Sequence, residues 1–191
     1  MVFAYRPLFL AFVASRPHSR TTMTELRASA ASSLLPQLTN DDGATAIGSE
    51  LVDERVKNKR VALYFAAGWC PMCTSFEPAL LKFREEAAKS GKPIELIYVS
   101  SDRSEESQSS RAASLGMLSI PREETADVKR KYKIWAGSER GELGSDRRSG
   151  VPALVVLDNA GKEMSFVAAE SQGAKSLETW PMDDEQGIWL A

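Results

Sequence analysis

The residue types that build metal sites and disulfide scaffolds are scarce in this chain. Its 191 residues include two cysteines and one histidine. A zinc site needs about four nitrogen or sulfur ligands, and only His18, in an N-terminal segment of unusual composition, could join the two cysteines. We therefore expect no metal site. A single cysteine pair also argues against a disulfide-rich secreted module and favours a reducing compartment.

A strong net charge and long apolar runs are missing as well. The formal net charge is −2, so electrostatics give no reason to expect nucleic acid as a partner. No uncharged apolar run reaches the roughly 18 residues of a transmembrane helix, and no membrane span is expected. The hydrophobic share of 43% and the charged share of 26% are those of an ordinary globular protein. The length fits one domain, which we expect to be a monomer.

The first 28 residues differ from the rest of the chain. They contain four arginines and no acidic residue before Glu25. This composition predicts a targeting leader for a mitochondrion or plastid at 1–28, followed by a single domain at 29–191. Two alternatives stay open. The apolar stretch 8–14 could belong to a secretory signal, and a start at Met23 would leave a disordered extension on a cytoplasmic protein.

The two cysteines stand in the run Trp-Cys-Pro-Met-Cys at 69–73, between a predicted strand and a predicted helix. Residues 61–66 are apolar without helical spacing, which indicates a strand buried on both faces. Apolar residues then recur at helical spacing from Phe76 to Ala87. The cysteines therefore begin a helix, whose unpaired N–H groups and positive dipole end favour a thiolate.

This position gives the two thiols different roles. Cys70, at the helix start, is the predicted nucleophile. Cys73 lies one turn further in, should be more buried, and can resolve a mixed disulfide held on Cys70. The alternative is an inert structural disulfide, but so short a ring would stabilise the fold only weakly.

Several motifs resemble thioredoxin-fold oxidoreductases: the Trp-Cys-Pro-x-Cys run, Pro78 five residues beyond Cys73, and Gly-Val-Pro-Ala-Leu at 150–154. Residues 63–70 and 76–80 are similar to the tryparedoxin and nucleoredoxin branch, and the likeness extends over 34–184. The resemblance implies an α/β thioredoxin-like fold, with a central mixed β-sheet, helices on both faces and an N-terminal hairpin.

The remaining elements follow from turn and capping signals. We expect a helical turn at 50–56, and a helix that Asp102 or Ser104 caps and that ends at 115–116. Residues 136–150 show no apolar periodicity and predict a loop, longer than the corresponding connection in the resembling family. Further strands are expected at 44–47, 94–100, 151–158 and 162–168, and further helices at 123–133 and 174–180.

The resemblance assigns a substrate-binding role to four residues around the cysteines. In that family the bond between Val151 and Pro152 is cis, and the backbone before the proline lies against the cysteines and pairs with the substrate. Trp69 is an exposed platform, although a plain core residue is the alternative. Pro71 stiffens the ring between the thiols and removes a backbone donor.

Two auxiliary candidates depart from the family pattern. Tyr64 occupies the position where thioredoxins carry a buried aspartate, which leaves the proton acceptor for Cys73 open. Asp102 matches the acid of the branch's Trp-Asp-Glu motif, but Ser101 and Arg103 replace its neighbours. Capping a helix is therefore an equal alternative to a functional role for Asp102.

Arg147 and Arg148 precede the Val151–Pro152 loop. They could face a substrate at the thiols and receive its carboxylates. The alternative is that both side chains are simply solvated on a loop.

Together these features predict a protein-disulfide reductase that needs no cofactor. The resemblance implies a peroxiredoxin as one acceptor and trypanothione or glutathione as the donor, and a thioredoxin reductase is an alternative donor that stays open. Met72 replaces a histidine that would make the disulfide more oxidising, so the redox potential should lie toward the reducing end. Two other functions stay open: a redox-gated binding module, for which the unusual 136–150 segment is the hint, and a disulfide isomerase or oxidase of a secretory lumen.

Overall fold

The computed structural model describes residues 54–185 and 187–189. The predicted leader, the N-terminal hairpin and the strand at 44–47 lie outside these residues. Residues 54–56 are helical and belong to the helical turn predicted at 50–56, whose first residues are also outside the described part.

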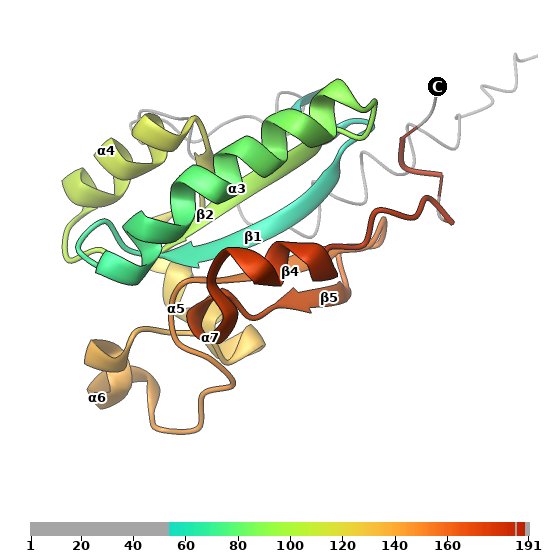
Figure 1. Cartoon of the computed structure of the whole chain (residues 1–191). Helices are drawn as coiled ribbons and strands as arrows, with labels where there is room; N and C mark the ends of the chain where they lie inside the picture. The colour runs from blue at the N-terminus through green and yellow to red at the C-terminus, as the bar shows by residue number, and fades with distance from the viewer. Residues whose placement is uncertain (1–53, 186, 190–191) are drawn as a thin grey trace, which may run out of the picture.

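A five-stranded mixed sheet with the order β3-β2-β1-β4-β5 forms the centre of the fold (Figure 1). Central β1 pairs parallel with β2 and antiparallel with β4. All residues of β1, β2 and β4 are buried, which explains why their sequences are apolar runs and do not alternate. The strands are β1 (Arg60–Ala66), β2 (Ile94–Ser100), β3 (Leu118–Ser119), β4 (Ala153–Leu157) and β5 (Glu163–Val167).

Helices cover both faces of this sheet, as the resemblance implied. Tyr64 and Phe65 are neighbours on β1 and therefore point to opposite faces. The ring centroid of Tyr64 lies 6.2 Å from that of Phe76 on one face, and that of Phe65 lies 6.0 Å from that of Tyr132 on the other. The helices are α3 (Pro71–Lys89), α4 (Glu105–Leu115), α5 (Arg122–Tyr132), α6 (Arg140–Leu143), α7 (Ala169–Gln172), and the 3-10 helices η1 (Gly137–Glu139) and η2 (Gly173–Thr179).

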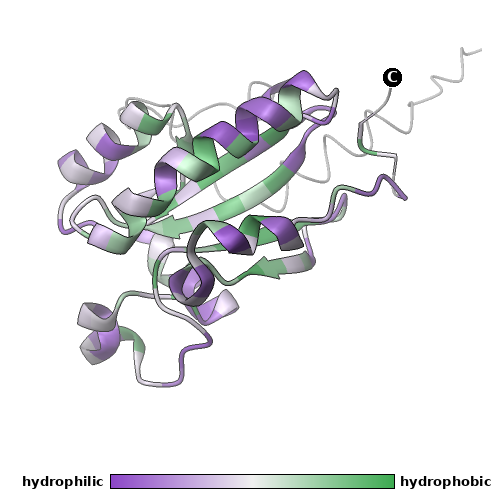
Figure 2. Cartoon of the chain, in the orientation of Figure 1, coloured by the Kyte–Doolittle hydropathy of each residue, from purple (hydrophilic) through white to green (hydrophobic). Residues whose placement is uncertain are grey.

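The two aromatic contacts place α3 and α5 on opposite sides of the sheet. Figure 2 shows the matching pattern: the strands are mainly hydrophobic, and the outward sides of the helices are hydrophilic. The carboxyl ends of β1 and β2 lie side by side, since Ala66 pairs with Ser100, and Phe65 pairs with Ala153 at the start of β4. Three loops therefore meet at this edge of the sheet.

The structure corrects three predictions of local structure. Residues 136–150 are not only a loop, because they contain η1 and α6, which are too short to show periodicity. The last helix is not a single α-helix at 174–180: α7 ends at Gln172, before Gly173 with a φ of 55°, and a 3-10 helix follows over Gly173–Thr179. Strand β3 was missed, since two residues carry no alternating pattern.

Candidate active site

The loop between β1 and α3 places the two cysteines at the sheet edge. Cys70 is the N-cap of α3, and Pro71 follows it as the first helical residue, where a missing N–H costs nothing. The Cys70 carbonyl accepts the backbone N–H of Thr74 at 3.1 Å, which closes the first turn. The positions predicted for Cys70 and Cys73 at the beginning of a helix agree with this geometry.

The two thiols differ in their access to solvent. Both cysteines are free. The Cys73 side chain is fully buried, whereas Cys70 keeps 7% of its surface exposed, between Trp69 at 40% and Met72 at 49%. A partner that contacts these two exposed side chains therefore reaches Cys70 first.

Burial raises the pKa of the Cys73 thiol far above its ordinary value. A hydrogen bond with Cys70 and the negative charge of Asp102 act in the same direction, and a backbone hydrogen bond with Ala67 opposes them. Cys73 thus stays protonated at neutral pH in the reduced protein. A buried, protonated thiol is a poor nucleophile, so Cys73 is not the thiol that attacks first in this state.

Alkaline pH is expected to destabilise the reduced protein. Burial also raises the pKa values of Tyr64 and Tyr98. A group whose pKa is higher in the folded than in the unfolded state stabilises the fold fully at pH values below its unfolded-state pKa. This unfolded-state pKa is 9.0 for cysteine and 10.0 for tyrosine, and the stabilisation is lost as the pH rises above it. The free energy of unfolding should fall by about 1.4 kcal/mol per pH unit for each such group.

Urea unfolding of the reduced protein between pH 8 and pH 11 measures this loss. The Cys73→Ser variant should lose less stability between pH 9 and pH 10, since Cys73 has the lowest unfolded-state pKa of these three buried groups and contributes most of their loss there. Equal slopes in the two proteins would contradict the buried, protonated state of Cys73.

The bond between Val151 and Pro152 is cis, as the resemblance implied. The Val151 carbonyl oxygen lies 3.8 Å from the Cys70 sulfur, so the proline loop borders Cys70. The backbone N–H of Gly150 donates to the Glu170 carboxylate at 2.5 Å. A Cβ at Gly150 would come within 2.0 Å of a Glu170 carboxylate oxygen, so any larger residue there would displace this side chain.

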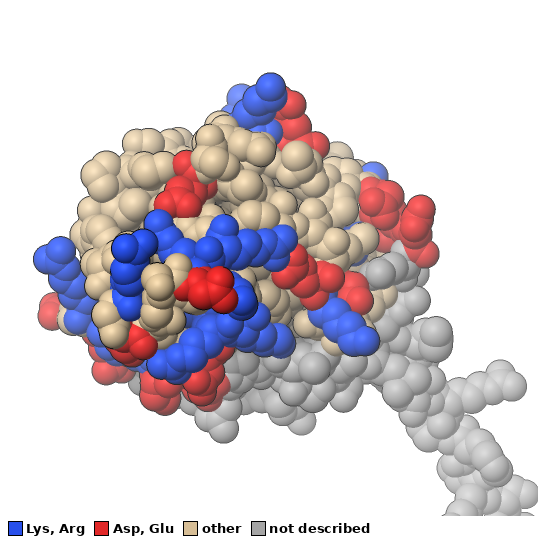
Figure 3. Space-filling model, turned by 90° about the horizontal axis from the view of Figure 1, so that it is seen from below, with Lys and Arg blue, Asp and Glu red and all other residues tan. Residues whose placement is uncertain are grey.

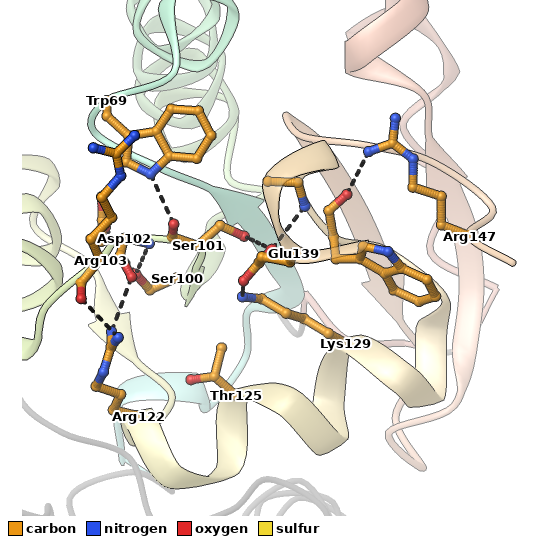
Figure 4. Close-up of polar contacts among 12 residues, drawn as sticks. Trp69, Ser100, Ser101, Asp102, Arg103, Arg122, Thr125, Lys129, Glu139 and Arg147 are labelled. Carbon is orange, nitrogen blue, oxygen red and sulfur yellow. Dashed lines mark hydrogen bonds and ion pairs between the residues drawn. The ribbon is translucent and has the colours of Figure 1, made fainter. Parts of the chain in front are cut away.

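Trp69 is an exposed residue beside the nucleophile and not a core residue. Its indole Nε1–H donates to the Ser101 carbonyl at 2.9 Å, which fixes the orientation of the ring. The Arg103 guanidinium lies 5.5 Å from the ring centroid on its face. The exposed ring can therefore contact a partner while the Ser101 carbonyl holds its N–H edge (Figure 4).

Asp102 does not cap a helix: the N-cap of α4 is Ser104, whose side chain accepts the Ser107 N–H. The Asp102 carboxylate is buried and accepts hydrogen bonds from the Gly68 N–H at 2.8 Å, the Tyr98 hydroxyl at 2.6 Å and the Ser100 hydroxyl at 2.8 Å. It thereby ties the loop before the cysteines to the end of β2. Asp102 is a positioning residue for this loop.

The Tyr64 hydroxyl donates to the Glu77 carboxylate at 3.4 Å. Glu77 is itself buried and forms an ion pair with Arg111 of α4. The Tyr64 hydroxyl thus contacts a buried carboxylate that α3 supplies. Sequence reasoning missed Glu77, although it lies on the stripe formed with Cys73 and Leu80, where a charged residue signals a buried partner.

Arg147 and Arg148 are held by contacts within the fold. Arg147 donates to the Trp135 carbonyl at 2.8 Å and lies 3.6 Å from Glu170. Arg148 pairs with Glu163 at 2.6 Å, and its guanidinium lies over the ring of Phe166. Figure 3 shows acidic side chains among the Lys and Arg side chains on the face seen from below.

Among residues 54–185 and 187–189, no group of three or more His, Cys, Asp or Glu side chains is arranged to hold a metal ion. Within the same residues, none of the helices has the length and apolar character needed to cross a membrane.

Comparisons with known proteins agree with the geometry. A family model described as thioredoxin-like matches residues 58–163. Probable nucleoredoxin 1 from Arabidopsis thaliana is 26% identical over 147 residues, which cover 76% of this chain and 22% of that protein. Nucleoredoxin from Mus musculus is 30% identical over 115 residues, which cover 60% of this chain and 24% of that protein. The chain thus spans about a quarter of the length of these curated relatives.

Solved structures show the same fold. Tryparedoxin II from C. fasciculata superposes with a TM-score of 0.58 at 23% identity, over 84% of this chain and 98% of that one. Tryparedoxin I from Leishmania major superposes with a TM-score of 0.54 at 27% identity, over 78% of this chain and 93% of that one.

Proposed function

Because this chain belongs to the thioredoxin-like family of thiol–disulfide oxidoreductases, in its tryparedoxin- and nucleoredoxin-like branch, we propose that it reduces disulfide bonds of protein substrates through Cys70 and Cys73. The observation that carries this proposal is the asymmetry of the thiols. Cys70 keeps a small exposed surface at a helix N-terminus beside the cis-proline loop, and Cys73 is fully buried and protonated one turn further along the helix.

The reaction proceeds in two exchanges. The Cys70 thiolate attacks one sulfur of the substrate disulfide, the substrate S–S bond breaks, and the departing substrate sulfur takes up a proton. Cys73 then loses its proton and attacks the Cys70 sulfur, which releases the second substrate thiol. Two electrons have passed to the substrate, and the chain holds a Cys70–Cys73 disulfide. An external dithiol or reductase restores the two thiols.

The cis-proline loop that borders Cys70 suits the binding of an extended substrate segment. The Val151 carbonyl lies beside the Cys70 sulfur, and the exposed Trp69 and Pro71 flank it on the chain. Backbone pairing at the cis-proline loop would hold the substrate chain while its disulfide meets the thiol. This mode of binding depends little on sequence and allows several protein substrates.

We propose a peroxiredoxin as an acceptor, and as donor a glutathione-type thiol, trypanothione or a thioredoxin reductase. Membership of the branch supports this assignment. The composition of residues 1–28 supports a mitochondrial or plastid location.

Catalytic reduction of insulin disulfides tests the proposed function. With dithiothreitol as the donor, the wild-type chain should release many insulin B chains per molecule, and Cys70→Ser should release none above the rate of dithiothreitol alone. The competing function, a redox-gated binding module, predicts stoichiometric binding of a partner that persists in Cys70→Ser and no multiple turnover in the wild type. The absence of turnover in the folded wild-type chain would reject the reductase.

A further inference from the structure

The segment at 136–150 is closed at its base and forms a compact unit. Ile134 and Ser149 form a β-bridge, and the Trp135 indole donates to the Gly144 carbonyl at 3.1 Å. Within this unit the Glu139 carboxylate accepts three hydrogen bonds, from the Ala136 N–H at 2.8 Å, Lys129 Nζ at 2.5 Å and the Ser101 hydroxyl at 2.8 Å (Figure 4). Of these three donors, only Ser101 contacts Trp69 next to Cys70.

Ser101 connects Glu139 to the active-site tryptophan. Its backbone N–H donates to the Ala66 carbonyl at the end of β1 at 2.8 Å, and its carbonyl accepts the Trp69 indole N–H at 2.9 Å. The Ser101 residue is buried, with 5% of its surface exposed. Ser101 therefore contacts Glu139 through its hydroxyl and orients Trp69 through its carbonyl oxygen.

Lys129 of α5 fixes Glu139 in place. The Lys129 side chain is 4% exposed and that of Glu139 is 22% exposed, so the pair is largely removed from water. Burial lowers the pKa of Lys129, and the hydrogen bond and charge of Glu139 oppose that effect. If Glu139 left the pair, the buried Lys129 ammonium would lose its direct ion-pair partner, which is costly. The Glu139 carboxylate is therefore a fixed acceptor.

Two departures from the family pattern meet in this contact. The resemblance implies that the 136–150 segment is longer than the usual connection, and that Ser101 stands where the Trp-Asp-Glu motif of the branch has tryptophan. The short hydroxyl at 101 is what donates to the carboxylate that the longer segment supplies. Ser101 and the 136–150 segment are thus joined by this hydrogen bond.

From these contacts we propose that Glu139 is a positioning residue, which acts through Ser101 to hold Trp69 in the orientation that receives the substrate at Cys70. The expected effect on kinetics rests on the proposed function, whereas the expected effect on the orientation of Trp69 is independent of it. It predicts that loss of the Glu139–Ser101 hydrogen bond loosens Trp69 and weakens substrate binding. The chemistry of the cysteines themselves should remain.

The test compares Ser101→Ala and Glu139→Gln with a matched control. Ser101→Ala removes the connecting hydroxyl and keeps the buried Lys129–Glu139 pair. We therefore expect this variant to fold even if Glu139→Gln destabilises the protein. Asp146→Asn is the control, because it breaks the exposed Lys133–Asp146 pair of the same segment. The first readout is hydrogen exchange of the Trp69 indole N–H by NMR, with the signal identified by its loss in Trp69→Phe.

We expect Trp69 exchange to accelerate about two- to tenfold in Ser101→Ala, the size of one net hydrogen bond, with no change in the control. With insulin as substrate, KM should rise by a similar factor while kcat and the rate of Cys70 alkylation by iodoacetamide stay unchanged. In a Trp69→Phe background, which lacks the indole N–H, Ser101→Ala should have no further effect on KM.

Unchanged Trp69 exchange in Ser101→Ala would overturn the proposal even if the wild-type protein reduces insulin. An equal rise of KM in the Trp69→Phe background would also overturn it, since the effect would then not pass through Trp69. If the wild type showed no turnover at all, the proposed function would fail, and the exchange experiment would still decide the role of Glu139.

Discussion

Replacement of Cys73 by serine is expected to stop turnover after a single chemical step. Cys70 keeps its place at the N-cap of α3 and can still open a substrate disulfide, but no internal thiol is left to release the product. An intramolecular thiol acts at an effective concentration far above that of a millimolar external thiol, so steady-state insulin reduction should fall by about a thousandfold or more. The measurement is the B-chain release rate with limiting dithiothreitol.

The first half-reaction should survive in the same variant. Each molecule should open one insulin disulfide at close to the wild-type rate and hold insulin as a mixed disulfide on Cys70, followed by no further reduction. Serine is nearly the same size as cysteine, so the fully buried position 73 should keep its packing. Steady-state turnover within a few-fold of the wild type would show that Cys73 is not the resolving thiol.

Removal of the Asp102 carboxylate is expected to cause the largest loss of stability near the site. Asp102→Ala would leave the Gly68 N–H and the hydroxyls of Tyr98 and Ser100 without their acceptor in a buried place. Each unsatisfied buried group costs about 1–3 kcal/mol, so the free energy of unfolding should fall by about 3–5 kcal/mol. Urea unfolding at pH 7 measures this change.

Asp102→Asn provides the matched control. An asparagine oxygen can still accept from Gly68, and the rotatable hydroxyls of Tyr98 and Ser100 can turn to accept from its amide. Its loss should be about 1–2 kcal/mol, clearly smaller than that of the alanine variant. A loss below about 1 kcal/mol in Asp102→Ala would contradict a structural role for this carboxylate.

The sequence predicts those parts of the site that depend on neighbours along the chain. Cys70 and Cys73 are separated by two residues, and the apolar run before them and the helical spacing after them fix their place at a helix start. The strands β1, β2 and β4 were predicted because burial on both faces makes each a continuous apolar run. The cis bond before Pro152 came from the family resemblance, since sequence alone gives cis a low frequency.

Contacts between distant parts of the chain were not predictable in this way. Ser101 and Glu139 are 38 residues apart, and Glu77 and Arg111 are 34 apart. Neither pair belongs to a periodic pattern that would bring its members together. Asp102 was ambiguous for a related reason: its sequence neighbours allow a cap, and only the pairing of β1 with β2 brings Gly68 within reach.

The exchange order of the two thiols is the central claim, and intact-mass measurement of trapped adducts tests it most directly. After reaction of each reduced protein with insulin and acid quenching, Cys73→Ser should carry one insulin molecule that dithiothreitol releases. Cys70→Ser should carry none, and the wild type should have lost two hydrogen atoms without an adduct. An insulin adduct on Cys70→Ser, with none on Cys73→Ser, would contradict the assignment of Cys70 as the nucleophile.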